Sequence, residues 1–488
     1  MRKPPPMHAI DLTAPADRTE PVPIPGARHR AAPRTRRRSR WDRAPHLLAF
    51  ALFAAYTTHS VLRYHRMQTR SWDLGIFEQA IRAYAQLEAP VVDLKGPGTN
   101  ILGDHFSPVT ALIAPAYRLF PTPVTLLVAQ AALFAIAAIP VTRAATRLLG
   151  RASGLAIGVA YGLSWGIQQA VDFDFHEICF AVPLIAFSLE SLMRRRWRAA
   201  LLWAAPLVLV KEDLGVTLAA IALVVAWRAR RERFRVTLYA LGVAAFGLIA
   251  TAVTLTVLIP AFNNTGVYGY WEKVDGGPSP FGGADVKLRT VAWLLLPTGL
   301  LAVRSPLVLA GVPTLGWRFL SGEEHYWSTD WHYSAVLMPV LFLALVDAVA
   351  TSRRSPRPWL RAYADRLPAC AAAAALALTT AQPLSALTES AAYHKPSRAT
   401  AAENLLARIP DGATVESDVG ALSRLAGRCR VLWVGDSRGV TPDWIALDNN
   451  SGWVEDPLAY ARRLHPKATY RLSGAAGGYL LLARVDRR

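Results

Sequence analysis

Residues 238–260 read LYALGVAAFGLIATAVTLTVLIP, an apolar run without a charged side chain. A helix needs roughly 20 such residues to cross the hydrocarbon core of a bilayer. Comparable blocks recur along the chain of 488 residues, which is 52% hydrophobic and has a mean hydropathy of +0.23. Because these blocks are too long for strands, the sequence predicts an all-α polytopic membrane protein.

The charge of the chain follows these apolar blocks. The chain carries 54 Lys and Arg residues against 35 Asp and Glu residues, which gives a net charge of +19. Base reading requires a folded basic surface, whereas the basic runs here stand directly beside apolar blocks, at residues 34–43, 194–198, 228–235 and 353–361. The pattern argues against a nucleic-acid-binding protein and assigns the basic runs to the cytoplasmic ends of membrane spans.

In membrane proteins, Lys and Arg gather in the loops on the cytoplasmic side, and this rule predicts the topology of the chain. Residues 1–43 are rich in Pro and Arg without apolar periodicity, which predicts a disordered basic cytoplasmic tail. A transmembrane domain is expected over residues 44–390, with about eleven spans that leave every basic run inside. Its outer loops are expected at residues 65–106, 263–285 and 321–332.

Two segments near the first outer loop differ from simple spans. SWDLGIFEQAIRAYAQ places apolar residues at helical spacing, which predicts an amphipathic helix on the outer membrane surface, with Asp73 at its start. Residues 106–120 are apolar but short, and Pro108 and Pro115 interrupt them. We therefore expect a re-entrant or interfacial segment there.

Residues 391–488 have the composition of a soluble domain. Their apolar runs are short, and strand-like and helix-like segments alternate, which predicts a small extracytoplasmic α/β domain. No Gly-rich phosphate loop follows a strand, so no nucleotide is assigned to it. The expected strands are ATVESD, CRVLWV, DWIALD, ATYRLS and GYLLLARV, and the expected helices are ATAAENLLARI, VGALSRLAG and DPLAYARRL.

The most polar interruption of the apolar pattern is VDFDFHEICF at residues 171–180, which holds Asp172, Asp174, His176 and Glu177. Ionisable groups at membrane depth cost several kcal/mol unless they are hydrated, paired or bound to a ligand. The cluster is therefore a candidate functional site.

In the predicted topology, four polar clusters emerge on the outer face. Carboxylates and imidazoles without a thiolate suit Mg²⁺ or Mn²⁺, or general-base catalysis on a hydroxyl, and argue against a structural zinc site. The clusters are Asp73 with Glu78, Asp104 with His105, Asp174 with His176 and Glu177, and Glu323, Glu324 and His325 with Asp330 and His332. The divalent cation is expected on Asp73, His176 and Glu177.

Structural explanations remain open for some of these residues. Asp73 is placed to cap a helix, and His105 to satisfy backbone groups at a turn. Glu323 and Glu324 suit an ordinary solvated loop. HEICF lacks a second His four residues after the first, so the zinc-protease pattern is not met.

Lys211, Glu212 and Asp213 interrupt an apolar stretch at residues 201–225. Each flanking segment is short for a full crossing, which predicts a hairpin whose tip points into a hydrated cavity. A lysine there is a suitable ligand for a lipid-linked phosphate. The alternative is a hairpin tip whose charges neutralise one another.

The motifs SWDLGIFEQA, GDHFSP, DFHE, LVLVKEDLG and HYSAVLMP resemble the DUF2079 family of predicted membrane proteins over most of residues 45–485. That family is similar to the GT-C superfamily of integral membrane glycosyltransferases. Its members have an essential Asp in the first outer loop, amphipathic helices on the membrane there and often a soluble C-terminal domain outside. The resemblance therefore implies a GT-C-like fold.

The resemblance also implies a function and assigns roles to residues. It implies transfer of a hexose or pentose from a polyprenyl-phosphate donor to a glycan, lipid or protein acceptor on the outer face of the cell membrane. The catalytic residues expected are Asp73, Asp174 and Glu177, with His176 orienting a substrate or binding a metal. The substrate-binding residues expected are Lys211, Glu212, His105 and His325, with Lys211 on the donor phosphate.

Two other functions remain open. Buried charges also form substrate or proton pathways in lipid and solute transporters, although the chain shows no obvious internal repeat. A non-catalytic envelope assembly protein with the same fold would show an incomplete set of charges. The enzyme hypothesis requires that Asp73, Glu177 and Lys211 share one cavity, which a separation beyond roughly 20 Å would contradict.

Overall fold

The computed structural model describes residues 43–70, 72–231, 233–263, 266–270 and 282–485. The expected tail at residues 1–43 lies outside the described residues, except for Arg43. So does most of the expected outer loop at residues 263–285.

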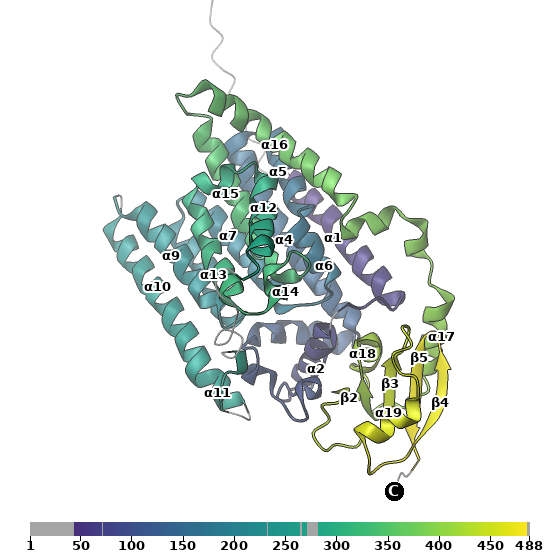
Figure 1. Ribbon diagram of the computed structural model, residues 1–488. Coiled ribbons are helices and arrows are strands. Elements are labelled where there is room, and N and C mark those ends of the chain that lie inside the picture. Colours follow the sequence, from purple (N-terminus) through teal and green to yellow (C-terminus); the bar gives the residue numbers. More distant parts are fainter. Residues whose placement is uncertain (1–42, 71, 232, 264–265, 271–281, 486–488) are drawn as a thin grey trace, which may run out of the picture. The chain divides into compact units, whose positions relative to one another are not determined.

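A helical bundle makes up the larger part of the described chain (Figure 1). Its helices are α1 (Ala44–His65), α2 (Asp73–Ala85), α3 (Ala114–Leu119), α4 (Pro123–Leu149), α5 (Arg151–Gly162), α6 (Trp165–Asp172), α7 (Ala181–Met193), α8 (Trp197–Ala204), α9 (Leu214–Ala229), α10 (Phe234–Val253), α11 (Ile259–Phe262), α12 (Ala284–Leu295), α13 (Val312–Leu320), α14 (Glu324–Trp327), α15 (Leu337–Ser352) and α16 (Pro358–Thr379).

Three helical segments of the described chain are long and apolar enough to cross a membrane. They are Pro123–Leu149, Phe234–Phe262 and His332–Ser352. Shorter apolar helical segments cover Trp197–Leu209, Leu214–Ala229 and Pro306–Leu320. The expected count of about eleven spans therefore stays a prediction.

Some expected spans are divided. The apolar stretch at residues 155–170 does not form one continuous helix, since α5 ends at Gly162 and α6 begins at Trp165. Residues 106–120 form the 3₁₀ turn Pro108–Ile113 followed by the short helix α3, which together are too short to cross a bilayer. Where a helix breaks within a membrane, backbone N–H and C=O groups lack partners in the helix. Such groups must be buried in protein or face a cavity.

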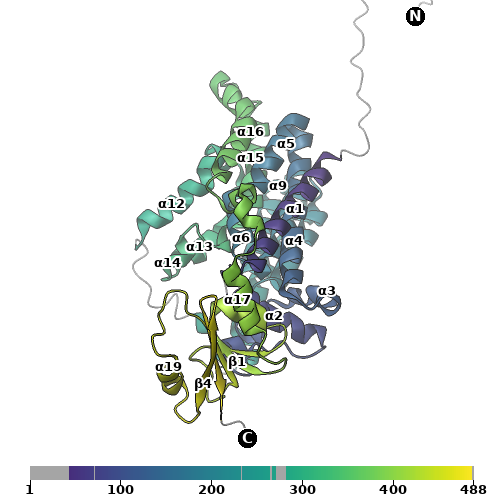
Figure 2. The ribbon, with the colours of Figure 1, turned by 90° about the vertical axis from the view of Figure 1, so that its right-hand side faces the viewer.

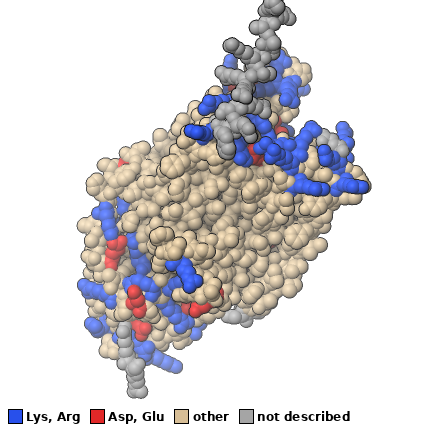
Figure 3. Space-filling model, turned by 180° about the vertical axis from the view of Figure 1, so that it is seen from behind, with Lys and Arg blue, Asp and Glu red and all other residues tan. Residues whose placement is uncertain are grey.

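One face of the molecule has a broad apolar zone. Seen from behind, a broad zone without charged side chains separates two zones rich in Lys and Arg (Figure 3). Exposed large apolar side chains run along α10 at Phe234, Leu238, Leu241, Phe246, Ile249 and Val253. A surface this apolar is unfavourable in water and is typical of contact with lipid.

The C-terminal part of the chain contains a five-stranded mixed sheet with strand order β2-β1-β3-β5-β4. β1 pairs in parallel with β2 and β3, whereas β5 pairs antiparallel with β3 and β4. The strands are β1 (Thr414–Ser417), β2 (Arg430–Trp433), β3 (Trp444–Asp448), β4 (Tyr470–Ala476) and β5 (Tyr479–Arg484), and the helices are α17 (Ser397–Leu406), α18 (Val419–Leu425) and α19 (Pro457–Leu464). All eight elements coincide with the expected segments.

Helix α2 packs between the bundle and the sheet (Figures 1 and 2). Its residues Leu74, Phe77 and Ile81 join the core of the bundle, whereas Ile76 and Ala80 join a second core with α17, α18 and one face of the sheet. The expected amphipathic helix is thus buried on both sides. This packing fixes the position of Asp73 at its first residue.

Candidate functional site

Asp73 is the first residue of α2, and its carboxylate lies beside two histidines. Its Oδ2 atom lies 3.9 Å from Nε2 of His176. One ligand atom from each of Asp73, His176 and His332 lies within 4.8 Å of the others. The N-cap position belongs to Trp72, with no side-chain capping bond, so the capping explanation for Asp73 fails.

The loop that carries His176 is fixed by one side chain of α4. The amide of Gln130 donates to the carbonyl oxygens of Ala170, at 3.2 Å, and Asp174, and its Oε1 atom accepts from the backbone N–H of His176 at 3.0 Å. Asp174 has a φ of 77°, a left-handed conformation that Asp tolerates better than most residues. Gln130 therefore sets the direction in which the His176 side chain leaves the backbone.

From His176 the contacts continue to Lys211. Nδ1 of His176 lies 2.7 Å from Oε2 of Glu177, and Oε1 of Glu177 lies 3.0 Å from Nζ of Lys211. The Glu177 side chain is fully buried, and that of Lys211 is 12% exposed. The structure thus joins Asp73, Glu177 and Lys211 through contacts of 3.9 Å or less.

Glu212 turns the other way from Lys211 and binds the GDHFSP segment. Its Oε1 atom lies 2.8 Å from Nδ1 of His105 and accepts a hydrogen bond of 3.2 Å from the Tyr268 hydroxyl, while its Oε2 atom accepts from the N–H of Phe106 at 3.3 Å. His105 therefore bonds a side chain rather than backbone. Lys211 and Glu212 each have a partner distant in the sequence, so these two charges do not merely neutralise each other.

The buried charges of the site determine its protonation states. Burial raises the pKa of Glu177, but His176 and Lys211 outweigh burial and hold it well below its usual range. Burial lowers the pKa of Lys211, but Glu177 and Glu212 reverse the shift and hold it above its usual value. Glu177 and Lys211 are therefore a charged pair at neutral pH.

The Asp73 carboxyl is in a different electrostatic environment. Burial raises its pKa above the usual range for Asp, and the positive field of His176 opposes this only in part. A carboxyl with a raised pKa is a stronger base than an ordinary Asp carboxylate. The two carboxyls of the site are thus shifted in opposite directions, with the pKa of Glu177 lowered and that of Asp73 raised.

His332 was named among the outer polar residues but given no role at the site, and the structure places it there. Its ring stacks on that of His176 with centroids 3.6 Å apart. Neither ring nitrogen of His332 has a hydrogen-bond partner among the described residues, although the side chain is buried. The sequence signal was the position of His332 at the start of the apolar run that becomes α15.

Other candidate residues have contacts of their own. The Asp174 carboxylate accepts from the N–H of Arg70 at 2.7 Å. Glu78, buried in α2, accepts from the Tyr117 hydroxyl at 3.0 Å. His325 lies 3.5 Å from Glu323, and both side chains are more than a third exposed.

The chain matches the family described as "Predicted membrane protein (DUF2079)" over residues 63–274 and 282–480. No curated protein matches it.

Two solved structures of ArnT from Cupriavidus metallidurans are similar in fold. The structure bound to undecaprenyl phosphate has a TM-score of 0.55 and 15% identity, with 91% of this chain and 99% of the ArnT chain covered. The apo structure has the same TM-score and 13% identity, with 90% and 97% covered. Since ArnT is a GT-C glycosyltransferase, the expected resemblance to the GT-C fold is confirmed.

Proposed function

Because this chain belongs to the DUF2079 family of predicted membrane proteins and folds like ArnT, we propose that it is a GT-C-type membrane glycosyltransferase. It moves a sugar from a polyprenyl-phosphate donor to an acceptor of the cell envelope on the outer face of the membrane. The observation that carries the proposal is the chain of contacts from Asp73 through His176 and Glu177 to Lys211.

Lys211 is proposed to hold the donor phosphate. Its charge is maintained by Glu177, and its position between α8 and α9 is fixed by that ion pair. The ArnT structure, which contains undecaprenyl phosphate, supports a polyprenyl-linked ligand for this fold. When the bond between the sugar C1 and the phosphate oxygen breaks, negative charge develops on the phosphate, and a fixed ammonium stabilises it.

Asp73 is proposed to be the general base. Its raised pKa suits it to take the proton of the acceptor hydroxyl as that oxygen forms its bond to the sugar C1. Glu177 stays ionised and positions Lys211 and His176 instead of exchanging protons. The Asp174 carboxylate accepts from the backbone N–H of Arg70, so we assign it to holding the loop.

As the alternative to the role of base, Asp73 would hold a divalent cation together with His176 and with His332 in place of the expected Glu177, which pairs with Lys211. Two imidazoles and one carboxylate favour a first-row ion such as Mn²⁺ over Mg²⁺. The ring nitrogens of His332 have no hydrogen-bond partner among the described residues, so one of them is available to bind the ion. A bound ion would add positive charge beside the reacting sugar. His332→Ala is expected to weaken Mn²⁺ binding at least about tenfold in an EPR titration, and unchanged binding would reject the site.

The test of function is turnover of polyprenyl-phosphate sugars by the purified protein in nanodiscs that contain envelope acceptors. Mass spectrometry would follow the loss of donor and the release of polyprenyl phosphate. Asp73→Asn should lower the rate about 100-fold or more, as expected for loss of a general base, while Glu389→Gln on the exposed surface serves as the matched control.

The controls separate an inactive protein from a wrong hypothesis. The proposal is supported if the wild type turns the donor over, Asp73→Asn does not, and Glu389→Gln does. A folded wild-type protein that consumes none of the hexosyl and pentosyl donors, or an Asp73→Asn variant as active as wild type, contradicts it.

A further inference from the structure

A cavity lies where the end of α1 meets the C-terminal sheet. It has a volume of about 470 Å³, within the range of sites for small ligands. Its lining comes from the end of α1 and the residues after it, from the segment after α16, and from Asp448, Asn450 and Tyr479 at the sheet. Asp448 ends β3, so the cavity adjoins a strand end, where open α/β sheets commonly bind ligands.

Arginines dominate the charge of this cavity. Four of them line it, Arg63, Arg66, Arg70 and Arg398, against the two lining carboxylates of Asp172 and Asp448. A histidine, His59, also lines it.

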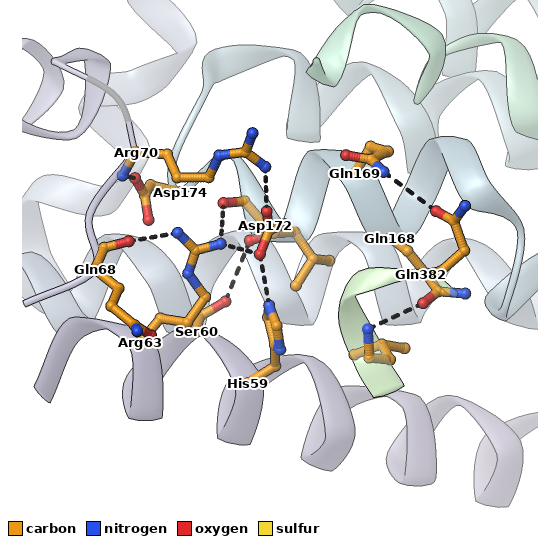
Figure 4. Close-up of polar contacts among 12 residues, drawn as sticks. His59, Ser60, Arg63, Gln68, Arg70, Gln168, Gln169, Asp172, Asp174 and Gln382 are labelled. Atoms are coloured by element: carbon orange, nitrogen blue, oxygen red, sulfur yellow. Dashed lines mark hydrogen bonds and ion pairs between the residues drawn. The ribbon is translucent and has the colours of Figure 1, made fainter. Parts of the chain in front are cut away.

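Asp172 already has its partners within the protein (Figure 4). Its Oδ1 atom contacts Nε2 of His59, at 3.0 Å, and the guanidinium of Arg63, and its Oδ2 atom accepts from Arg70 at 2.5 Å. Two arginines and a histidine therefore share one carboxylate. Asp172 can neutralise only part of the charge beside it.

The other two arginines are not neutralised. Among the residues that the structure describes, neither Arg66 nor Arg398 forms an ion pair, and the buried Nε atom of Arg66 has no hydrogen-bond partner. Asp448 accepts a hydrogen bond of 3.0 Å from the N–H of Asn450. A buried guanidinium N–H without a partner is unfavourable, and a ligand that accepts its hydrogen bond removes that cost.

The position of these arginines is also informative. Arg63, Arg66 and Arg70 lie at the end of α1 opposite to Arg43 and the basic residues before it. In the predicted topology the cytoplasmic end of α1 is the end at Arg43, so the rule of positive charge on the cytoplasmic side does not account for the arginines at the other end.

We propose that this cavity binds an oxyanion, phosphate or carboxylate, carried by a sugar-sized or lipid ligand. The guanidinium groups of Arg66 and Arg398 provide the fork-shaped donors that bind such groups in pairs of hydrogen bonds. The site is separate from Lys211, which is not among the residues that line the cavity: Asp172 contacts the arginines, whereas Glu177 contacts Lys211. Its charge does not depend on whether the Lys211 site transfers a sugar.

The test is hydrogen–deuterium exchange on the full-length protein, which reports binding locally and so separates this cavity from Lys211. Inorganic phosphate and glucuronate are titrated in detergent, and nanodiscs of phosphatidylglycerol are compared with phosphatidylcholine. We expect slower exchange at residues 62–70 and 448–452 with at least one of these anions. Arg66→Gln and Arg398→Gln should each raise the concentration for half-protection about tenfold, the effect of one lost charge-assisted hydrogen bond.

The matched control is Arg471→Gln, on an exposed position of β4. If soluble anions slow exchange, both cavity variants weaken this protection and the control retains it, the ligand is a soluble anion. If only phosphatidylglycerol gives this result, the ligand is a lipid headgroup. No protection with any anion, or protection that both variants leave unchanged, overturns the proposal. Arg398 is exposed, so Arg398→Gln remains informative if Arg66→Gln fails to fold.

Discussion

The Lys211–Glu177 ion pair illustrates the difference between stabilising and functional interactions. Removing one partner of a buried pair leaves a charge without compensation and costs about 3–5 kcal/mol, whereas removing both costs far less. A buried ion pair therefore adds little net stability, and the function of this one is to fix the positive charge of Lys211.

Lys211→Met is expected to lower the unfolding free energy by about 3–5 kcal/mol, because Glu177 remains charged and buried. The double variant Lys211→Met with Glu177→Gln should recover most of that loss. Unfolding in detergent by chemical denaturation would measure both. Additive losses in the double variant would show that the pair is not coupled.

Glu78 should make stability depend on pH. Burial raises the pKa of Glu78 to about 8, compared with 4.5 for the free group, so the folded protein keeps the proton that the unfolded chain releases. Stability should therefore fall as pH rises from about 4.5 and level off above about 8.

Glu78→Gln keeps the acceptor for Tyr117 and removes the ionisation. The difference in unfolding free energy between Glu78→Gln and wild type should shift in favour of the variant by a few kcal/mol from pH 5 to pH 8.5. Thermal unfolding at these two pH values measures the gain. Parallel stability curves for the two proteins would show that Glu78 ionises normally.

At the scale of elements, the site depends on a loop that one helix holds in place. Gln130 of α4 binds two backbone groups on the loop between α6 and α7 and a third in the last turn of α6. Its amide was visible in the sequence as a polar residue within a long apolar run, but no spacing rule connects residue 130 to residue 176.

Gln130→Ala should loosen this loop and leave the helices intact. Losing the amide leaves buried backbone groups without partners, at a cost of about 1–3 kcal/mol. Faster hydrogen exchange at residues 172–178 and lower sugar transfer are expected, with Gln86→Ala, at an exposed position, as the control. If exchange in the loop is the same in Gln130→Ala and the control, Gln130 does not hold it.

Local patterns were sufficient for most elements. In the C-terminal part of the sequence, short apolar runs alternate with turn residues, so β1 to β5 were predictable from composition and spacing. The division of residues 155–170 into α5 and α6 was not, because the break at Leu163 and Ser164 contains no proline.

At the scale of the whole molecule, α2 joins the bundle to the C-terminal sheet. The Arg82 guanidinium donates to the carbonyl oxygens of Ala426, at 2.9 Å, and Cys429, at 3.1 Å. Because α2 also carries Asp73, the packing of the C-terminal domain supports the site from outside the membrane helices.

Arg82→Ala should weaken that connection by about 1–3 kcal/mol, since two partly buried carbonyls lose a charged donor. Faster exchange at residues 426–429 and a lower melting temperature are expected. Arg118→Ala, at an exposed arginine, is the control. Equal effects of the two variants would show that the Arg82 contacts contribute nothing specific.

Long-range contacts limited what the sequence alone could reveal of the site. The proximity of Asp73, His176, Glu177 and Lys211 was expected from the topology, and the structure places them in contact. The stacking of His332 on His176 and the arginine cavity beside Asp172 depend on packing between distant helices. Neither has a local sequence pattern, so only the fold reveals them.

Lys211 is the residue proposed to hold the phosphate of a polyprenyl phosphate. The most direct measurement is the binding of undecaprenyl phosphate to the purified protein, by native mass spectrometry or microscale thermophoresis. The double variant Lys211→Met with Glu177→Gln, which avoids an unpaired buried charge, should bind at least about tenfold more weakly, while Lys395→Met should match wild type. Equal affinity in all three proteins would contradict the claim.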